Sequence, residues 1–148
     1  MVGSLMYLTS TQPDLAYVVS IISRFMSKPT NLHLQPAKRI MRYIKGTLDY
    51  GIMYKGTTSG LIGYTDNDYA GNLDDRRSTS GYVFMLGGGI VSWLSKKRTY
   101  SYNRQHECSS QAVWLRRITE QLGCSHNEGT VIYCDNSSTI KLTKNPVL

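Results

Sequence analysis

The sequence is poor in the residues that bind zinc or build disulfide frameworks. Three cysteines and three histidines are spread over its 148 residues. The thiols of Cys108, Cys124 and Cys134 form no CxxC pair, and their spacing to the histidines does not fit a zinc site. Because an odd number of cysteines also disfavours a disulfide-stapled secreted domain, we expect free and mostly buried thiols.

Long apolar runs and a secretory leader are also missing. No segment approaches the roughly 18–20 apolar residues that span a bilayer, which argues against an integral membrane protein. The N-terminal stretch lacks a basic start, and the polar residues from Thr11 to Asp14 interrupt its apolar run. On these features alone, the sequence therefore predicts an intracellular protein.

Acidic residues are fewer than basic ones, and most of the excess of basic residues lies in one part of the chain. The sequence carries 17 Lys and Arg against 10 Asp and Glu, a formal net charge of +7. Seven of the cations and only two of the acids lie in residues 1–60. Because a basic surface suits polyanionic partners such as nucleic acid, the N-terminal part is the candidate for such a contact.

Apolar periodicity in the first 55 residues predicts two helices joined by a short loop. The first covers about residues 15–28 and ends at Pro29. The second is capped by Asn31 and closes at Gly46. Its apolar face is expected to contain Leu34, Ala37, Ile40, Met41 and Ile44. Its solvated face, called the basic face below, carries Lys38, Arg39, Arg42 and Lys45.

From residue 51 onward the pattern changes to that of an α/β domain. Short strands are expected at residues 51–54, 61–66, 80–86, 90–95 and 130–135. The glycines at positions 87, 88 and 89 predict a hairpin between two of these strands. One helix is expected at residues 109–122, with Trp114 and Leu122 on its inner face, and a last helix is expected from Asn136.

Asp66 and Asp135 stand out because each ends an apolar strand and each is followed by Asn. Strand–helix–strand connections usually bring two strands side by side in parallel, and ligands gather at the carboxyl ends of such strands. Two carboxylates placed there can share Mg²⁺, the metal of in-line phosphodiester hydrolysis. The alternative is structural: Asp66 belongs to an Asp-rich turn, and Asp135 caps the following helix.

Several motifs resemble those of copia-type retrotransposon Pol. Five stretches resemble its ribonuclease H region: YTDNDYAG at 64–71, TSGY at 79–82, WLSKK at 93–97, QAVWLRR at 111–117 and YCDN at 133–136. A further stretch, AKRIMRYIKGT at 37–47, resembles the end of its reverse transcriptase region. The resemblance implies an α/β fold, with an incomplete ribonuclease H-like mixed sheet in residues 56–148. An αα-hairpin in residues 1–55 is expected to precede it.

Departures from the family pattern imply that catalysis is lost. The resemblance implies four acids, of which Asp66 matches the first and Asp135 the third, while the fourth lies beyond Leu148. The stretch that should hold the second is several residues short, and its local candidate, Glu107, is about six residues out of place. Six residues rotate a helix by about 240°, so Glu107 is expected to face the wrong way. We therefore expect no enzyme and no cofactor, with Mg²⁺ bound weakly at most by vestigial Asp66 and Asp135.

The whole sequence also resembles a secreted RxLR effector of an oomycete, a downy mildew. Arg39, Ile40, Met41 and Arg42 are one Leu-to-Met change from Arg-x-Leu-Arg, although no acidic segment follows. This resemblance implies a protein that is secreted into plant cells, contacts an unknown host plant protein and suppresses host cell death. The structural alternative makes the tetrapeptide half of an amphipathic helix, with Ile40 and Met41 packed and both arginines solvated.

The preferred hypothesis from sequence is the non-enzymatic effector that the overall resemblance implies. The alternative is an inactive retrotransposon remnant with at most weak nucleic-acid binding. A Mg²⁺-dependent ribonuclease H is the third hypothesis.

Overall fold

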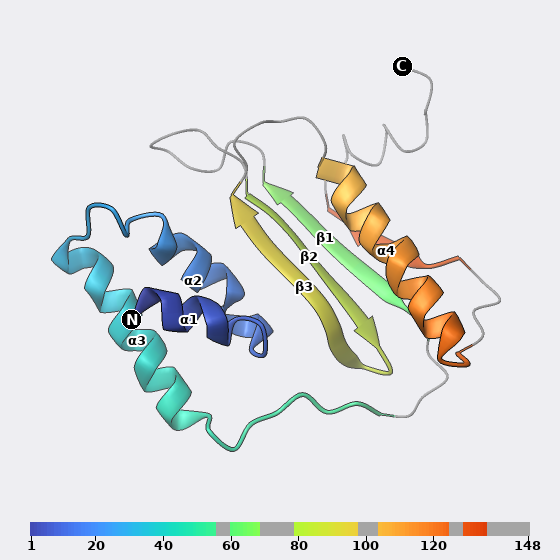
Figure 1. Ribbon diagram of the computed structural model, residues 1–148, viewed down its shortest axis with the longest axis horizontal. Coiled ribbons are helices and arrows are strands. Elements are labelled where there is room, and N and C mark those ends of the chain that lie inside the picture. The colour runs from blue at the N-terminus through green and yellow to red at the C-terminus, as the bar shows by residue number, and fades with distance from the viewer. Residues whose placement is uncertain (56–59, 69–78, 98–103, 125–128, 136–148) are drawn as a thin grey trace. The chain divides into compact units, whose positions relative to one another are not determined.

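The computed structural model describes residues 1–55, 60–68, 79–97, 104–124 and 129–135 (Figure 1). Its packing separates two compact units, Met1–Ile52 and Met53–Leu148. The sequence places the division three residues later, after Lys55. Within the described ranges, no helix combines the length and the apolar character needed to cross a membrane.

The first unit is helical. It contains α1 (Val2–Leu8), the 3₁₀ turn η1 (Pro13–Leu15), α2 (Ala16–Ser23) and α3 (Asn31–Gly46). Apolar side chains from all four elements form its core: Leu5, Leu15, Val19, Ile22, Ala37 and Ile40. The expected αα-hairpin is therefore represented by α2 and α3, and α1 is a helix that the sequence analysis missed.

The first predicted helix is shorter than expected. α2 ends at Ser23 instead of continuing to about residue 28. The hydroxyls of Ser20 and Ser23 each donate a hydrogen bond of 2.7 Å to the carbonyl three residues earlier. Because such bonds compete with the helical ladder, they favour an early end of the helix.

The second predicted helix, α3, ends at Gly46 as expected, but its cap is Thr30 and not Asn31. The backbone nitrogen of Thr30 lies 3.0 Å from Nδ1 of His33, as part of a reciprocal capping box. Two predicted members of the apolar face, Leu34 and Met41, are exposed, Met41 by 52%. Both lie about 70–90° around the helix from the centre of the buried face, which accounts for their exposure.

The second unit is built on a mixed sheet, whose described strands are ordered β3-β2-β1-β4. They are β1 (Ile62–Asp68), β2 (Thr79–Leu86), β3 (Gly89–Lys97) and β4 (Val131–Cys134). β2 pairs antiparallel with both β1 and β3, whereas β4 pairs parallel with β1. The α/β class and the parallel pairing of the two aspartate-bearing segments are therefore confirmed.

The β2–β3 hairpin forms where the glycine run predicts it. Gly87 and Gly88 have positive φ angles of 58° and 79°, which suit a two-residue hairpin turn. The strand expected at residues 51–54 is wrong, because that segment makes only isolated bonds to the hairpin. The Lys55 amide donates to the Gly87 carbonyl at 3.0 Å, and the Tyr54 hydroxyl donates to the Ile90 carbonyl at 2.8 Å.

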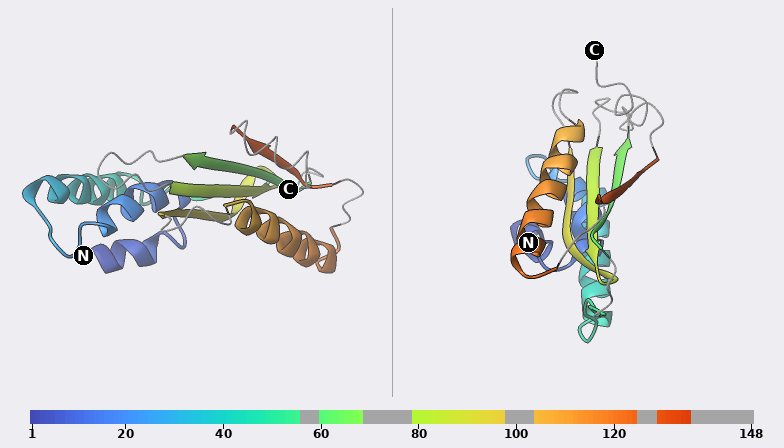
Figure 2. Two further views of the ribbon diagram at one scale, coloured as in Figure 1. Left: turned by 90° about the horizontal axis from the view of Figure 1, so that it is seen from above. Right: turned by 90° about the vertical axis from the view of Figure 1, so that its right-hand side faces the viewer.

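One face of the sheet is covered by α4 (Arg104–Gln121), as Figure 2 shows. The helix begins five residues before the expected start, and Cys108 in its early turns is buried. Its buried stripe joins the sheet in a core of Leu61, Phe84, Cys108, Ala112 and Leu115. Trp114 and Leu122, expected on the inner face, are exposed, because the buried stripe follows positions 108, 112 and 115. The helix expected from Asn136 lies outside the described residues.

Gly63 permits a close approach between the strands β1 and β2. Phe84 has no exposed surface, and a Cβ added to Gly63 would lie 2.7 Å from Cε1 of its ring. The same Cβ would lie 3.3 Å from Cγ1 of Ile132. Because β1, β2 and α4 enclose the Phe84 ring, it has no free space into which to turn.

Replacing Gly63 by alanine is expected to lower the free energy of unfolding by about 1–3 kcal/mol, the usual cost of overpacking a core. Urea denaturation followed by circular dichroism measures this loss. Gly129→Ala is the matched control in the same unit, because nothing lies within 4 Å of a Cβ at that position. Equal stability of Gly63→Ala and wild type would contradict the role given to Phe84.

Candidate functional site

The parallel pairing of β1 and β4 brings the two aspartates to neighbouring positions. The register pairs Thr65 with Cys134, so Asp66 and Asp135 are the next residues on adjacent segments. Both are exposed, and Asp135 directly follows β4. Asp66 lies within β1, which continues to Asp68, so it does not sit in a turn as the structural alternative proposed. These two carboxylates are the residues that could hold a divalent cation here.

Strand alternation separates the aspartates from α4. Leu61 packs with the α4 core, and Gly63 lies against the buried Phe84 ring. Residues two apart share a face of a strand, so Tyr64 and Asp66 belong to the opposite face. Glu107, the local candidate for the second family acid, lies in the first turn of α4. Among the described residues, no group of three His, Cys, Asp or Glu side chains could hold a metal ion.

Cys108 packs in the core of the second unit, on the side of the sheet that α4 covers. All three cysteines are free, as expected, but only Cys108 is buried, while Cys124 is exposed. Burial raises the pKa of the Cys108 thiol, and a hydrogen bond with Thr65 partly opposes that shift. Since thiolate is the reactive form, the raised pKa favours the less reactive, protonated thiol at Cys108.

Two tyrosines next to the aspartates form a pair that the sequence analysis did not identify. The rings of Tyr64 and Tyr133 stack with their centroids 5.2 Å apart. They are 45% and 55% exposed, on strands that pair directly at these two positions. The signal was present in the sequence, because each tyrosine precedes its aspartate by two residues.

The basic face of α3 is exposed as predicted. Its four cations, Lys38, Arg39, Arg42 and Lys45, are all solvent accessible. Three of them, Lys38, Arg42 and Lys45, fall within about 60° of one another on the helical wheel and span a rise of about 10 Å. Arg42 lies back along the helix, with its Nε donating to the Lys38 carbonyl at 3.4 Å. This arrangement forms a continuous cationic stripe.

The RxLR-like tetrapeptide occupies the middle of α3. Ile40 is buried and both arginines are exposed, which agrees with the amphipathic-helix alternative. Met41 does not pack as that alternative expected, because it projects to solvent. The tetrapeptide is therefore part of a regular helix in this chain.

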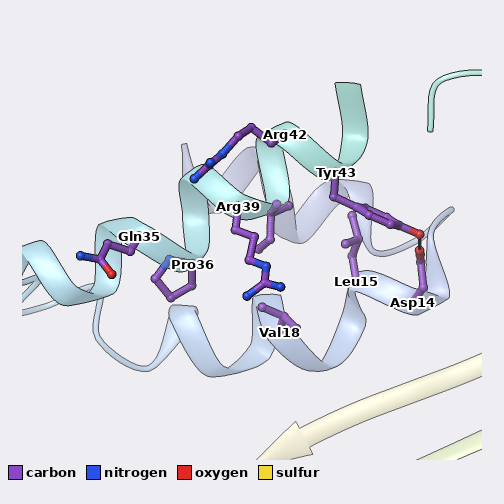
Figure 3. A pocket seen from close by; sticks show the side chains of 9 residues that line it. Asp14, Leu15, Val18, Gln35, Pro36, Arg39, Arg42 and Tyr43 are labelled. Atoms are coloured by element: carbon purple, nitrogen blue, oxygen red, sulfur yellow. Dashed lines mark hydrogen bonds between the residues drawn. The ribbon is translucent and has the colours of Figure 1, made fainter. Parts of the chain in front are cut away.

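A groove lies between α2 and α3, and we call it the α2–α3 groove (Figure 3). Its volume is about 790 Å³, and its lining residues are Asp14, Leu15, Val18, Gln35, Pro36, Arg39, Ile40, Arg42 and Tyr43. At one end the Tyr43 hydroxyl donates a short hydrogen bond to the Asp14 carboxylate. This bond raises the pKa of Tyr43. Sequence reasoning missed the groove because its walls come from separate segments.

Comparison with known proteins places the chain among retrotransposon sequences. It is 43% identical to the retrovirus-related Pol polyprotein from transposon RE1 of Arabidopsis thaliana, over 99% of this chain and 11% of that protein. The corresponding Pol polyprotein from transposon TNT 1-94 of Nicotiana tabacum is 39% identical over 97% of this chain and 11% of its own length. The chain thus spans about 11% of these relatives.

A much shorter protein is also similar. Secreted RxLR effector protein 161 of Plasmopara viticola is 46% identical over 77% of this chain and 87% of that protein. No protein-family model matches the chain, and no solved structure is similar to it. The chain belongs to the copia-type retrotransposon Pol family.

Proposed function

We propose that this Pol-related chain binds nucleic acid through the basic face of α3 and does not cleave it. The cationic stripe carries the proposal, because it places Lys38, Arg42 and Lys45 on one exposed side of a single helix. Lysine and arginine side chains neutralise phosphates without reading sequence, so the expected binding is electrostatic and tolerant of sequence.

The arrangement of the acids supports the proposed absence of cleavage. In-line phosphodiester hydrolysis needs metal ions held by several convergent carboxylates. Asp66 and Asp135 supply two, on the face of the sheet away from α4, and Glu107 lies on the helix that covers the other face. We infer a degenerate ribonuclease H-like domain in which Asp66 and Asp135 are vestigial and bind Mg²⁺ weakly at most.

Charge reversal on the stripe is expected to weaken nucleic-acid binding and its salt dependence together. For the double variant Lys38→Glu/Lys45→Glu, the slope of log K against log salt should shrink by about 2, one for each lost phosphate contact. Fluorescence anisotropy with a labelled RNA–DNA hybrid, measured at several salt concentrations, provides both values.

The matched control is Lys96→Glu/Arg117→Glu, which changes the net charge equally at exposed positions of the second unit. We expect it to keep most of the wild-type affinity. Binding that is independent of salt, or equal losses in the two double variants, would exclude α3 as the interface.

A second candidate function is supported by the relative from Plasmopara viticola. That protein is named a secreted RxLR effector, and the chain covers 87% of it. On this proposal the chain is secreted, enters plant cells and suppresses host cell death by contacting a host plant protein. The tetrapeptide from Arg39 to Arg42 would then act as a surface of a folded helix.

Transient expression in plant leaves together with a cell-death elicitor tests the second candidate. The effector proposal expects less necrosis with the wild-type chain than with an empty vector. Gly63→Ala at matched protein level reports whether destabilising the second unit weakens the suppression of necrosis. Unchanged necrosis with well-expressed wild-type protein would reject the effector role and leave the nucleic-acid proposal standing.

A further inference from the structure

We propose that the α2–α3 groove binds an acidic amphipathic helix presented by a partner protein. This site is distinct from the stripe proposed for nucleic acid, although Arg42 borders both. The groove lies wholly within the first unit, between helices of one well-packed core.

The floor of the groove is apolar and partly open. Leu15 and Ile40 are buried beneath it, whereas Val18 is 37% exposed and Pro36 is exposed. Their inner neighbours Val19, Ile22 and Ala37 already fill the core, so the floor side chains have one side against protein and one toward the groove. Apolar side chains of a ligand would gain burial on this floor, as in other helix-in-groove complexes.

The wall formed by α3 is cationic. Arg39 extends over Val18 in Figure 3, so its aliphatic stem adds to the floor while its guanidinium remains at the opening. Arg42 follows three residues later, but its side chain turns back along α3, with its Nε donating to the Lys38 carbonyl, so Arg39 is the cation that extends over the floor. A carboxylate on the ligand helix would pair with the Arg39 guanidinium.

The charge at the Tyr43 end of the groove also favours a ligand helix whose acids face α3. Asp14 lines the groove beside Tyr43 and accepts its hydroxyl hydrogen bond. An acidic ligand face is repelled there and attracted by Arg39. A ligand with apolar residues toward Val18 and acids toward α3 satisfies both constraints. An extended nucleic-acid strand would gain little from the apolar floor, because its charge is best matched by the stripe.

A selection experiment with the full chain tests this assignment. A phage-displayed library of randomised helical peptides of about 16 residues is enriched on the immobilised protein, and the enriched peptides are synthesised. We expect apolar residues at i, i+3, i+4 and i+7 flanked by Glu or Asp. Versions with Gln in place of each Glu should bind at least tenfold more weakly.

Two variants report on the groove itself. Val18→Trp fills the groove, and Arg39→Gln removes one wall cation without a large change in side-chain size. Each variant should lower the affinity for the enriched peptides at least tenfold. Lys38→Glu/Lys45→Glu, which leaves the groove lining intact, should change peptide affinity less than threefold while it weakens oligonucleotide binding. Circular dichroism checks that the variants fold.

Three results would overturn the proposal. They are no enrichment, enriched peptides without acids, or peptide binding that Val18→Trp and Arg39→Gln leave unchanged. Loss of oligonucleotide binding in Val18→Trp, with peptides unaffected, would assign the groove to nucleic acid instead. Failure of the nucleic-acid proposal alone would leave peptide binding intact.

Discussion

The contact between the Phe84 ring and the bare backbone of Gly63 determines the geometry of the second unit. Phe84 is completely enclosed, and no side chain larger than hydrogen fits at Gly63. The contact holds β1 in register with β2 and places one face of β1 against α4. Because side chains alternate along a strand, the same contact places Tyr64 and Asp66 on the other face of the sheet. A packing constraint in the core thereby decides on which face of the sheet the Asp66 carboxylate lies.

This division explains why we assign function to the first unit. Two aspartates reach neighbouring positions at the ends of parallel segments, yet α4, the helix that carries Glu107, covers the opposite face. The first unit instead offers a cationic stripe and an adjoining apolar groove on α3. Both depend on the burial of Ala37 and Ile40, which orients the remaining positions of α3 outward. The same helix therefore contributes to the core, the stripe and the groove.

Much of this architecture could be predicted from local patterns. The four described strands and the glycine hairpin follow from alternation and turn chemistry, and the basic face follows from helical periodicity. The start of α4 could not, because residues 104–108 show no apolar period and the burial of Cys108 against the sheet anchors them. The helix α2 ends earlier than expected, where the Ser20 and Ser23 hydroxyls bond to the backbone, and α1 was not predicted. The Tyr64–Tyr133 stack and the groove depend on distant segments, which single-element patterns do not report.

The central claim is that this Pol-related chain binds nucleic acid without cutting it. Incubation of the purified chain with an end-labelled RNA–DNA hybrid and Mg²⁺, followed by analysis of bound and cleaved hybrid in the same sample, tests it most directly. The account predicts salt-sensitive binding with the hybrid recovered intact, equally for wild type and Asp66→Asn. Mg²⁺-dependent cleavage by the wild type that disappears in Asp66→Asn would contradict it.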